Sequence, residues 1–529
     1  MMINSKQTKK ILAFTLLALH TGLCAQTPQQ VVNPPVVNDY APIQMFLASD
    51  GLEGRETGTP GSCIAASYIA SMMQKMNLRP YQANDKNQNT KLTDYFQDFI
   101  LLRFSPVNAS VFINRGGKKK SKPIQLVLYK DFTIINAFQS FSLESMPLFA
   151  GYGINSPELQ YNDYSDMNVK GKMVIVFDGY PGQQDTLSAT WRKFKSSAEK
   201  DVYDPGHKCL EAERQGAIAI MIINANYVNL KNDTTATSKA DNPDDTEYQD
   251  AEYFIPADLP KLAIPCFQLT ETGSRRLSEA LNLNFKGIEQ SYAQLASYQP
   301  FESKDNFSIT LHVAADTLKV HNVVGTLPGR DTNQTVVVGA HYDHLGKRGN
   351  NIYYGSDDNA SGVAGMLALA ETWTESKAVP PCNITFASWT AEEKGLIGSE
   401  YFANTLATPE KVKLYINLDM ISRSVAEDTA HRQLSIGTRK PDEYIRQIAR
   451  KSNSTLGRPF QLDLWDVTGH SGSDYASFTA KNIPVITCNT GLHNDYHTPR
   501  DIPENSDLIK MGEVLKVVND CLLEFLWGK

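Results

Sequence analysis

The hydrophobic pattern of the N-terminal region predicts a helix, a loop and a second helix between about Tyr40 and Leu78. Residues 49–61 are rich in glycine and interrupt the pattern, while Ala65–Met76 carries apolar residues at helical spacing. Two strands are expected further along the chain, at Tyr95–Leu102 and Ala109–Ile113. The region is therefore expected to contribute both helices and strands.

From Val320 onward, short apolar strands alternate with helices. The expected strands are Thr335–Ala340, Asn383–Trp389, Val412–Leu418 and Pro484–Cys488. The expected helices are Gly362–Trp373, Ser399–Leu406, Pro441–Ser452 and Leu508–Trp527. This alternation predicts an α/β fold, with a mostly parallel sheet flanked by helices on both faces. Such sheets bind their ligands beyond the carboxyl ends of the strands, so chemistry is expected at that edge.

A different pattern fills the region between about Lys118 and Tyr298. Short apolar strands are expected at Val174–Phe177, Ala217–Ile223 and Ile264–Phe267. The acidic segment Asn232–Asp250 has no periodicity and is expected to be a mobile loop. Because no titratable cluster with catalytic spacing occurs here, the region is interpreted as an inserted, β-rich, non-catalytic domain.

The first residues have the pattern of an export signal. Lys6, Lys9 and Lys10 precede the apolar run Ile11–Leu19, which is too short to span a bilayer. Cleavage after Ala25 is expected, which predicts a periplasmic or extracellular protein. Lipid attachment at Cys24 is the alternative, although Leu23 before it is larger than the residue such sites prefer. No later stretch is apolar enough to predict a transmembrane helix.

Length and charge narrow the possible functions. A chain of 529 residues exceeds what one hydrophobic core usually organises, so two folded units are expected. The expected parts are a signal peptide at 1–25, an N-terminal segment at 26–117, the insert at 118–298 and a main domain at 299–529, to which 26–117 also belongs. The net charge of −7 gives no reason to expect nucleic acid as a partner. The sequence does not indicate an oligomeric state.

Histidines and carboxylates gather at the predicted strand ends. The segments that carry them are His341-Tyr342-Asp343-His344, Asp357-Asp358, Glu392-Glu393, Asp419 and Asn494-Asp495-Tyr496-His497. Each segment alone has a structural explanation, such as a helix N-cap or a solvated loop. Their joint arrival at one sheet edge instead favours a metal site. Mixed imidazole and carboxylate ligation without cysteine suits catalytic zinc, with cobalt or manganese as alternatives.

The order of these motifs resembles a known family. The matching segments are His341–Asp343, Asp358–Gly362, Glu392–Ser399, Asn417–Asp419 and His497–Asp501. Together they resemble the M28 family of zinc peptidases, which includes bacterial aminopeptidases and glutamate carboxypeptidases. Within the insert, Phe149–Gly153 and Glu213–Ala217 are similar to a protease-associated (PA) domain, which several family members carry at this place.

The resemblance implies a site with two Zn²⁺ ions that share one carboxylate. Asp358 would bridge the ions, because the family's bridging Asp stands three residues before the Ser of its D-x-x-S-G motif; Asp357 is the competitor. His341 and Asp419 would complete the ligands of one ion. Glu393 and His497 would complete those of the other.

The resemblance also implies roles for residues beside the metals. Glu392 would be the general base, which takes a proton from water and passes it to the leaving amine. Tyr496 would stabilise the oxyanion, by analogy with a Tyr before the ligand His in some relatives. Asp343 would hold the tautomer of His341 by a hydrogen bond. Other histidines, including His493, are expected to be structural.

These features predict a secreted di-zinc metallo-exopeptidase that acts on peptides, with aminopeptidase as the default because this activity dominates the bacterial members. A glutamate-carboxypeptidase-like exopeptidase is the main alternative. A single-zinc glutaminyl cyclase and a non-catalytic binding relative are weaker alternatives, because all five ligand positions are filled. The sequence does not indicate whether peptides are trimmed from the amino or the carboxyl end.

Overall fold

The computed structural model describes residues 32–82, 90–115, 122–135, 138–165, 167–196, 203–228, 251–257, 259, 264–293, 301–470 and 472–528. The predicted signal peptide, with Cys24, and the acidic segment Asn232–Asp250 lie outside these residues. In the part of the chain that is described, no helix is long and apolar enough to cross a membrane.

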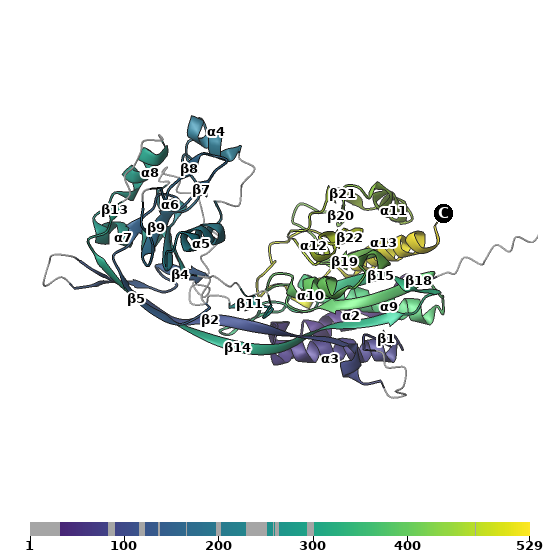
Figure 1. Cartoon of the computed structure of the whole chain (residues 1–529). Helices are drawn as coiled ribbons and strands as arrows, with labels where there is room; N and C mark the ends of the chain where they lie inside the picture. Colours follow the sequence, from purple (N-terminus) through teal and green to yellow (C-terminus); the bar gives the residue numbers. More distant parts are fainter. Residues whose placement is uncertain are drawn as a thin grey trace, which may run out of the picture. The chain divides into compact units, whose positions relative to one another are not determined.

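The chain divides into two compact units (Figure 1). The first comprises the chain up to Gln97 together with His321–Gly346 and Ile352–Lys529. The second comprises Asp98–Val320 with Lys347–Asn351, a range that includes the predicted insert at 118–298. The chain passes to the second unit within β2 (Phe96–Asn114) and returns within β14 (Asn306–Leu327). It passes between the units again within the short strands β16 (Gly346–Arg348) and β17 (Asn351–Tyr353).

A mostly parallel sheet forms the centre of the first unit. From β14, its strands follow the order β18 (Cys382–Trp389), β15 (Asp331–His341), β19 (Val412–Leu418), β22 (Val485–Asn489), β20 (Gln433–Thr438) and β21 (Gln461–Asp466). The four strands from β18 to β22 are parallel, and β14 and β20 pair antiparallel with β18 and β22. The predicted α/β fold is thus confirmed, with antiparallel partners on both sides of the parallel centre.

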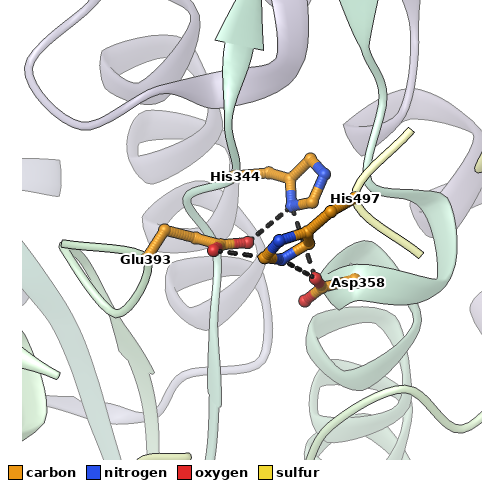
Figure 2. Close-up of side chains that lie close together, drawn as sticks. All are labelled: His344, Asp358, Glu393 and His497. Atoms are coloured by element: carbon orange, nitrogen blue, oxygen red, sulfur yellow. Dashed lines mark hydrogen bonds and ion pairs between the residues drawn. The ribbon is translucent and has the colours of Figure 1, made fainter. Parts of the chain in front are cut away.

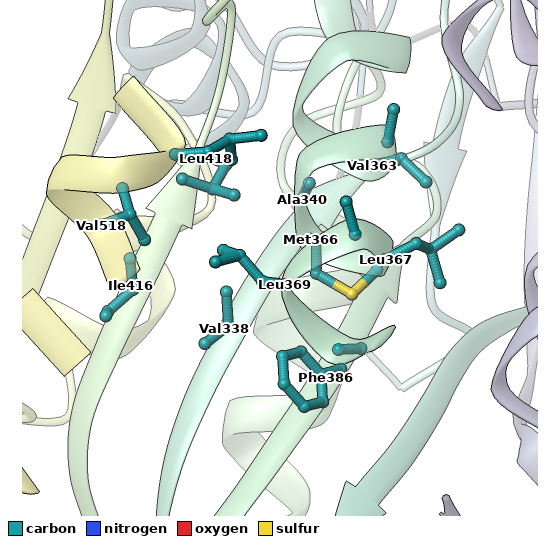
Figure 3. Close-up of a cluster of buried hydrophobic side chains, with 14 of the residues drawn as sticks. Val338, Ala340, Val363, Met366, Leu367, Leu369, Phe386, Ile416, Leu418 and Val518 are labelled. Atoms are coloured by element: carbon teal, nitrogen blue, oxygen red, sulfur yellow. The ribbon is translucent and has the colours of Figure 1, made fainter. Parts of the chain in front are cut away.

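The alternation of side chains along the central strands gives this sheet two buried faces. Val336, Val338 and Ala340 of β15 belong to the cluster that contains helices α9 (Gly362–Glu375) and α13 (Leu508–Trp527) (Figure 3). Their neighbour Val337 belongs to the cluster on the other face, with α10 (Ile397–Thr405) and α12 (Tyr475–Thr479). Successive residues of a strand point to opposite faces, so helices must cover both. The sheet edge where β15, β18, β19 and β22 end is therefore the place where polar side chains can gather.

The N-terminal helices complete the first unit. Helix α2 (Val37–Leu47) is followed by a short turn, η1 (Asp50–Arg55), and by helix α3 (Pro60–Lys75). Thr59 caps α3 by accepting a hydrogen bond from the amide of Ser62, and Pro60 follows at the first helical position. Buried residues of both helices belong to the same cluster as α9. The predicted helix–loop–helix is confirmed.

The second unit has its own sheet and core. Its strands follow the order β13 (Phe301–Glu302), β6 (Leu148–Phe149), β9 (Met173–Phe177), β10 (Ala219–Ile223), β12 (Cys266–Leu269) and β4 (Phe132–Ile135). Met173, Ile175 and Phe177 belong to one apolar cluster, and Val174 and Val176 to another. The sheet is thus buried on both faces, as a domain with its own core requires.

Candidate metal centre

The ends of four parallel strands carry the residues that the sequence singles out. Strand β15 ends at His341, Glu392 and Glu393 follow β18, and Asp419 follows β19 directly. His497 lies beyond β22. The fifth segment is the turn Ser356–Ser361 that precedes α9; it carries Asp358, whose peptide bond to Asn359 is cis. The fold brings all five predicted ligands to one edge of one sheet.

One group of side chains forms around His341. Its Nε2 lies 3.3 Å from Asp358 Oδ1 and 3.5 Å from Asp419 Oδ1. Glu392 Oε2 is slightly farther, at 3.9 Å from the same nitrogen. The His341 side chain is 1% exposed, and those of Asp419 and Glu392 are 14% and 12% exposed. An imidazole nitrogen thus faces three carboxylates in a nearly closed space.

A second group forms around His497 (Figure 2). Its Nε2 lies 3.0 Å from Asp358 Oδ2 and 3.3 Å from Glu393 Oε2. His344 joins this group, with its Nδ1 2.7 Å from Glu393 Oε1. Asp358 therefore offers one carboxylate oxygen to each group.

Asp357 has a different environment from Asp358. Its Oδ1 accepts hydrogen bonds from the amide and the hydroxyl of Ser422, at 2.7 and 2.9 Å. Its Oδ2 lies 3.4 Å from Nε2 of the buried His493, which the sequence analysis expected to be structural. Asp357 thus connects the turn to neighbouring loops, and Asp358 is the residue that faces both groups.

The ring of His341 is held by the main chain. Its Nδ1 lies 3.1 Å from the carbonyl oxygen of Asp343, which leaves Nε2 to face Asp358 and Asp419. The prediction that His341 hydrogen-bonds to the carboxylate of Asp343 is therefore wrong. That carboxylate instead accepts hydrogen bonds from Thr57 Oγ1 at 2.8 Å and from the amide of Glu392 at 3.1 Å. The chain turns after β15, which points the carbonyl of Asp343 at the ring and its carboxylate away from it.

His344 was not among the predicted ligands. It lies three residues after His341, in the loop beyond the strand, and its side chain is fully buried. The signal in the sequence is the spacing His-x-x-His at a strand end, which alone does not separate a ligand from a hydrogen-bonding partner. The contact with Glu393 Oε1 shows that His344 holds the carboxylate that also faces His497.

The electrostatics of the site follow from its crowded carboxylates. Burial raises the pKa of Glu392 well above its usual value, and the negative charges of Glu393 and Asp419 add to this. Burial also disfavours the charged form of Asp358, but the imidazoles of His341 and His497, whose Nε2 atoms lie 3.3 and 3.0 Å from its oxygens, hold its pKa well below the usual range. Burial opposes protonation of His497, yet Asp358 and Glu393 raise its pKa to about 10. Such a concentration of negative charge attracts cations.

The donor atoms also fit a divalent metal. Their separations across each group, 3.0 to 3.5 Å, match the edge of a zinc tetrahedron, which is about 3.3 Å for bonds of about 2.0–2.1 Å. Within the described part of the chain, two buried atoms that face these groups, Asp419 Oδ1 and His497 Nε2, make no hydrogen bond. Buried polar atoms normally have partners, so these atoms indicate a missing ligand.

Tyr496 lies beside the second group. Its ring stacks on that of His497, with centroids 3.8 Å apart. The loop that carries both residues is held by Asp495, which accepts hydrogen bonds from Arg423 at 2.9 Å and from Arg500 at 2.8 Å. Tyr496 is therefore close to the candidate metal site, and its role as an oxyanion donor stays a prediction.

Left-handed backbone occurs next to several site residues. Ala391, Met420 and His497 have φ values of 55°, 60° and 55°. Each such residue other than glycine costs on the order of 1–3 kcal/mol, and such residues are concentrated at functional sites. Ala391 precedes Glu392 and Met420 follows Asp419, so the unusual conformations occur where the chain must place a side chain.

A cavity of about 660 Å³ lies at the opposite edge of the sheet. It is lined by residues at the starts of the parallel strands, including Asp331, Cys382, Val412 and Pro484. None of the candidate site residues lines this cavity, so it is separate from the candidate metal centre.

Comparison with known proteins agrees with the geometry. Residues 322–522 match the family described as Peptidase family M28. Leupeptin-inactivating enzyme 1 of Streptomyces exfoliatus is 31% identical over 167 residues, which is 31% of this chain and 34% of that protein. A probable leucine aminopeptidase 2 of Arthroderma benhamiae is 33% identical over 177 residues, or 32% of this chain and 33% of that protein. The chain thus spans about a third of the length of these curated relatives.

A solved structure shares the fold over more of the chain. An aminopeptidase from Aneurinibacillus sp. strain AM-1 covers 94% of this chain and 95% of its own, with a TM-score of 0.59 and 19% identity. At that identity the likeness concerns the fold alone. The family match includes all seven predicted site residues, from His341 to His497. The part of the chain that builds the candidate metal centre is thus similar to peptidase family M28.

Proposed function

We propose that this chain is a zinc aminopeptidase whose site holds two Zn²⁺ ions. The observation that carries the proposal is the position of Asp358, whose two oxygens face two separate groups of imidazole and carboxylate ligands. A single carboxylate shared in this way is suited to bridging two cations. The mixed imidazole and carboxylate donors of both groups, without cysteine, support zinc as the metal. The name of a relative, a leucine aminopeptidase, supports the reaction.

The two ligand sets follow from the contacts. His341, Asp358 and Asp419 would hold one ion, and Asp358, Glu393 and His497 the other. His344 would fix Glu393 through its Oε1 atom, which leaves Oε2 to face the metal. Bound zinc supplies Lewis acidity, which acidifies water and polarises the carbonyl of the peptide bond.

Glu392 is the proposed general base. Its Oε2 atom lies 3.9 Å from His341 Nε2, farther than the oxygens of Asp358 and Asp419. Its main-chain amide donates a hydrogen bond to the carboxylate of Asp343. The carboxylate of Glu392 takes a proton from the attacking water and transfers it to the nitrogen of the leaving amine. Tyr496 donates a hydrogen bond to the oxygen that becomes negative as water adds to the carbonyl.

The proposed substrates are peptides with a free amino terminus. The support comes from the name of a relative, a leucine aminopeptidase. The predicted signal peptide supports export, with cleavage after Ala25 or lipid attachment at Cys24. Mass spectrometry of the mature N-terminus distinguishes these two.

The decisive experiment compares free, N-acetylated and C-amidated forms of one peptide, with metal content measured in parallel. An aminopeptidase cleaves the free and C-amidated forms, leaves the acetylated form intact and contains two zinc equivalents. Cleavage of the acetylated peptide from its carboxyl end moves the protein to the glutamate-carboxypeptidase branch. One tight zinc with cyclisation of N-terminal glutamine indicates a glutaminyl cyclase. Metal binding without turnover of any peptide indicates a binding protein.

A further inference from the structure

Three consecutive residues near the N-terminus contact the loops of the candidate metal centre. Arg55 is the last residue of the turn η1, and Glu56 and Thr57 follow it. All three lie outside residues 322–522, which match the peptidase family. The side chain of each one bonds to a loop that carries site residues. We propose that this tripeptide positions the metal-binding and proton-transfer groups of the enzyme, an inference that rests on the proposed function.

Arg55 links two ligand-bearing segments. Its guanidinium group is fully buried and donates to the main-chain carbonyls of Tyr342 at 2.8 Å, Tyr354 at 2.8 Å and Gly355 at 2.9 Å. A further bond goes to the carbonyl of Leu47 at 2.5 Å, at the end of α2. Tyr342 directly follows His341, and Gly355 begins the turn that carries Asp358. Arg55 thus fixes the loop of one ligand relative to that of the bridging ligand.

Glu56 and Thr57 reach the loop of the two glutamates. Glu56 Oε1 lies 2.9 Å from the ammonium group of Lys394, the residue after Glu393, and both side chains are largely buried. Thr57 Oγ1 donates to Asp343 Oδ2 at 2.8 Å, and the other oxygen of Asp343 accepts from the amide of Glu392. The tripeptide therefore contacts three of the five segments that supply ligands.

The backbone where the tripeptide begins has an unusual conformation. Glu53, Gly54 and Arg55 all have left-handed conformations, with φ values of 44°, 72° and 51°. A Cβ on Gly54 would lie 2.3 Å from the carbonyl oxygen of Tyr353, so only glycine fits there. Left-handed residues other than glycine cost on the order of 1–3 kcal/mol each, so the surrounding structure must hold them. The close backbone approach brings the Arg55 side chain between the two ligand loops.

A purely structural role would produce a different result from a positioning role. Loss of packing lowers the unfolding temperature, whereas loss of position lowers metal affinity or kcat in protein that stays folded. Residues that orient metal ligands typically change metal affinity or activity by about 10–100-fold when substituted. The test therefore measures zinc affinity, kcat at saturating zinc and unfolding temperature in the full chain.

Two variants and two matched controls make the test. Arg55→Lys keeps the charge but cannot reach four carbonyls, and its control is Arg446→Lys, an arginine on α11 (Glu443–Asn453) that bonds Thr438 and Trp465. Thr57→Val removes one hydroxyl, and its control is Thr385→Val on β18. We expect Arg55→Lys to bind zinc about 10–100-fold more weakly and Thr57→Val to lose about tenfold in kcat at full zinc occupancy. The controls should match the wild type in both quantities.

The outcomes separate this inference from the proposed function. If the wild type binds no zinc and cleaves no peptide, the proposed function is wrong. If the wild type binds two zinc ions while Arg55→Lys and Thr57→Val behave like their controls, the positioning role is overturned. If Arg55→Lys does not fold, Thr57→Val decides. The positioning role is supported if Thr57→Val has a lowered kcat while its unfolding temperature equals that of Thr385→Val. An unchanged kcat refutes the role.

Discussion

At the scale of single residues, two adjacent glutamates have different surroundings. Glu393 faces His497 with one oxygen and His344 with the other, whereas Glu392 Oε2 lies 3.9 Å from His341 Nε2. Two neighbouring residues of the same type can thus have different tasks, because the left-handed Ala391 turns the chain just before them.

The two glutamates are expected to give opposite results on substitution. Glu392→Gln should keep both zinc ions and nearly the same KM but lose a factor of about 10²–10⁴ in kcat, because a positioned general base is removed. Glu393→Gln should lose zinc together with activity. Metal analysis and steady-state kinetics on both proteins check this. Zinc loss in Glu392→Gln with retention in Glu393→Gln would show that the roles are exchanged.

His344 provides a second prediction at this scale. His344→Phe removes the donor to Glu393 Oε1 while filling similar space, so zinc should bind about 10–100-fold more weakly at the ion that Glu393 holds. His344→Asn keeps an N–H near the same place and should recover part of this loss. Competition with a chelator measures both affinities. Equal affinity in the wild type and His344→Phe would contradict the positioning of Glu393 by His344.

The sequence predicted the positions of the site residues but not all of their contacts. Ordered motifs at strand ends were enough to bring His341, Asp358 and His497 together, because parallel strands end at one edge. The bond from His341 to the carbonyl of Asp343, and the role of Arg55, depend on loop geometry and on contacts between residues far apart in the chain. No periodicity or spacing encodes such contacts.

At the scale of elements, hydrophobic periodicity predicted the buried strands and helices well. β19 and α13 have the predicted bounds, because Val412–Leu418 is continuously apolar apart from Lys413 and Asn417, and the helix is amphipathic over its length. The strands β20 and β21 were not predicted. Their residues alternate between apolar and polar, which is the pattern of a half-buried strand, but each strand has only six residues and few of them are apolar.

An ion pair at the start of α13 predicts a stability change with pH. Lys510 Nζ lies 2.8 Å from Asp428 Oδ2, and both side chains are almost completely buried. Burial raises the pKa of Asp428, but bonds from Lys510 and from the amides of Gln433 and Arg432 lower it to about 2. The unfolded pKa is about 3.9, so the pair contributes about 2–3 kcal/mol that is present above pH ~4. This contribution is lost as the pH falls towards 2.

Denaturant unfolding of Asp428→Asn checks this pair. The variant should be less stable than the wild type by at least about 2 kcal/mol at pH 7, and the difference should shrink between pH 4 and 2. Asp520→Asn, in the more exposed pair with Lys516 on the same helix, is the control and should change stability by less than about 1 kcal/mol. A difference for Asp428→Asn that does not depend on pH would rule out the charge as its cause.

At the scale of the whole molecule, the two units have separate cores. The apolar clusters around α9 and α12 belong to the first unit, and those around β9 belong to the second. The sequence indicated an insert from its change of pattern, but its edges lie within the long strands β2 and β14, where hydrophobicity does not change abruptly. The assignment of the second unit as a protease-associated domain stays a prediction.

Separate cores predict that the units respond to different changes. The proposed zinc ligands all lie in the first unit. Removal of zinc should therefore lower the stability of that unit, by about 2.7 kcal/mol when the free zinc concentration was 100 times the Kd. In the second unit, the buried Lys208 donates to the carbonyls of Tyr152, Phe177 and Gly179. Lys208→Met leaves these carbonyls without that donor, which should destabilise the second unit by about 1–3 kcal/mol.

Calorimetry of the full chain with and without chelator tests this independence. Chelation should shift one thermal transition and Lys208→Met the other, and the two shifts should add when both changes are made, because the changed groups share no partner. Zinc content of Lys208→Met should equal that of the wild type. A single transition that both changes move together would show that the units unfold as one cooperative body, which would contradict the separation of their cores.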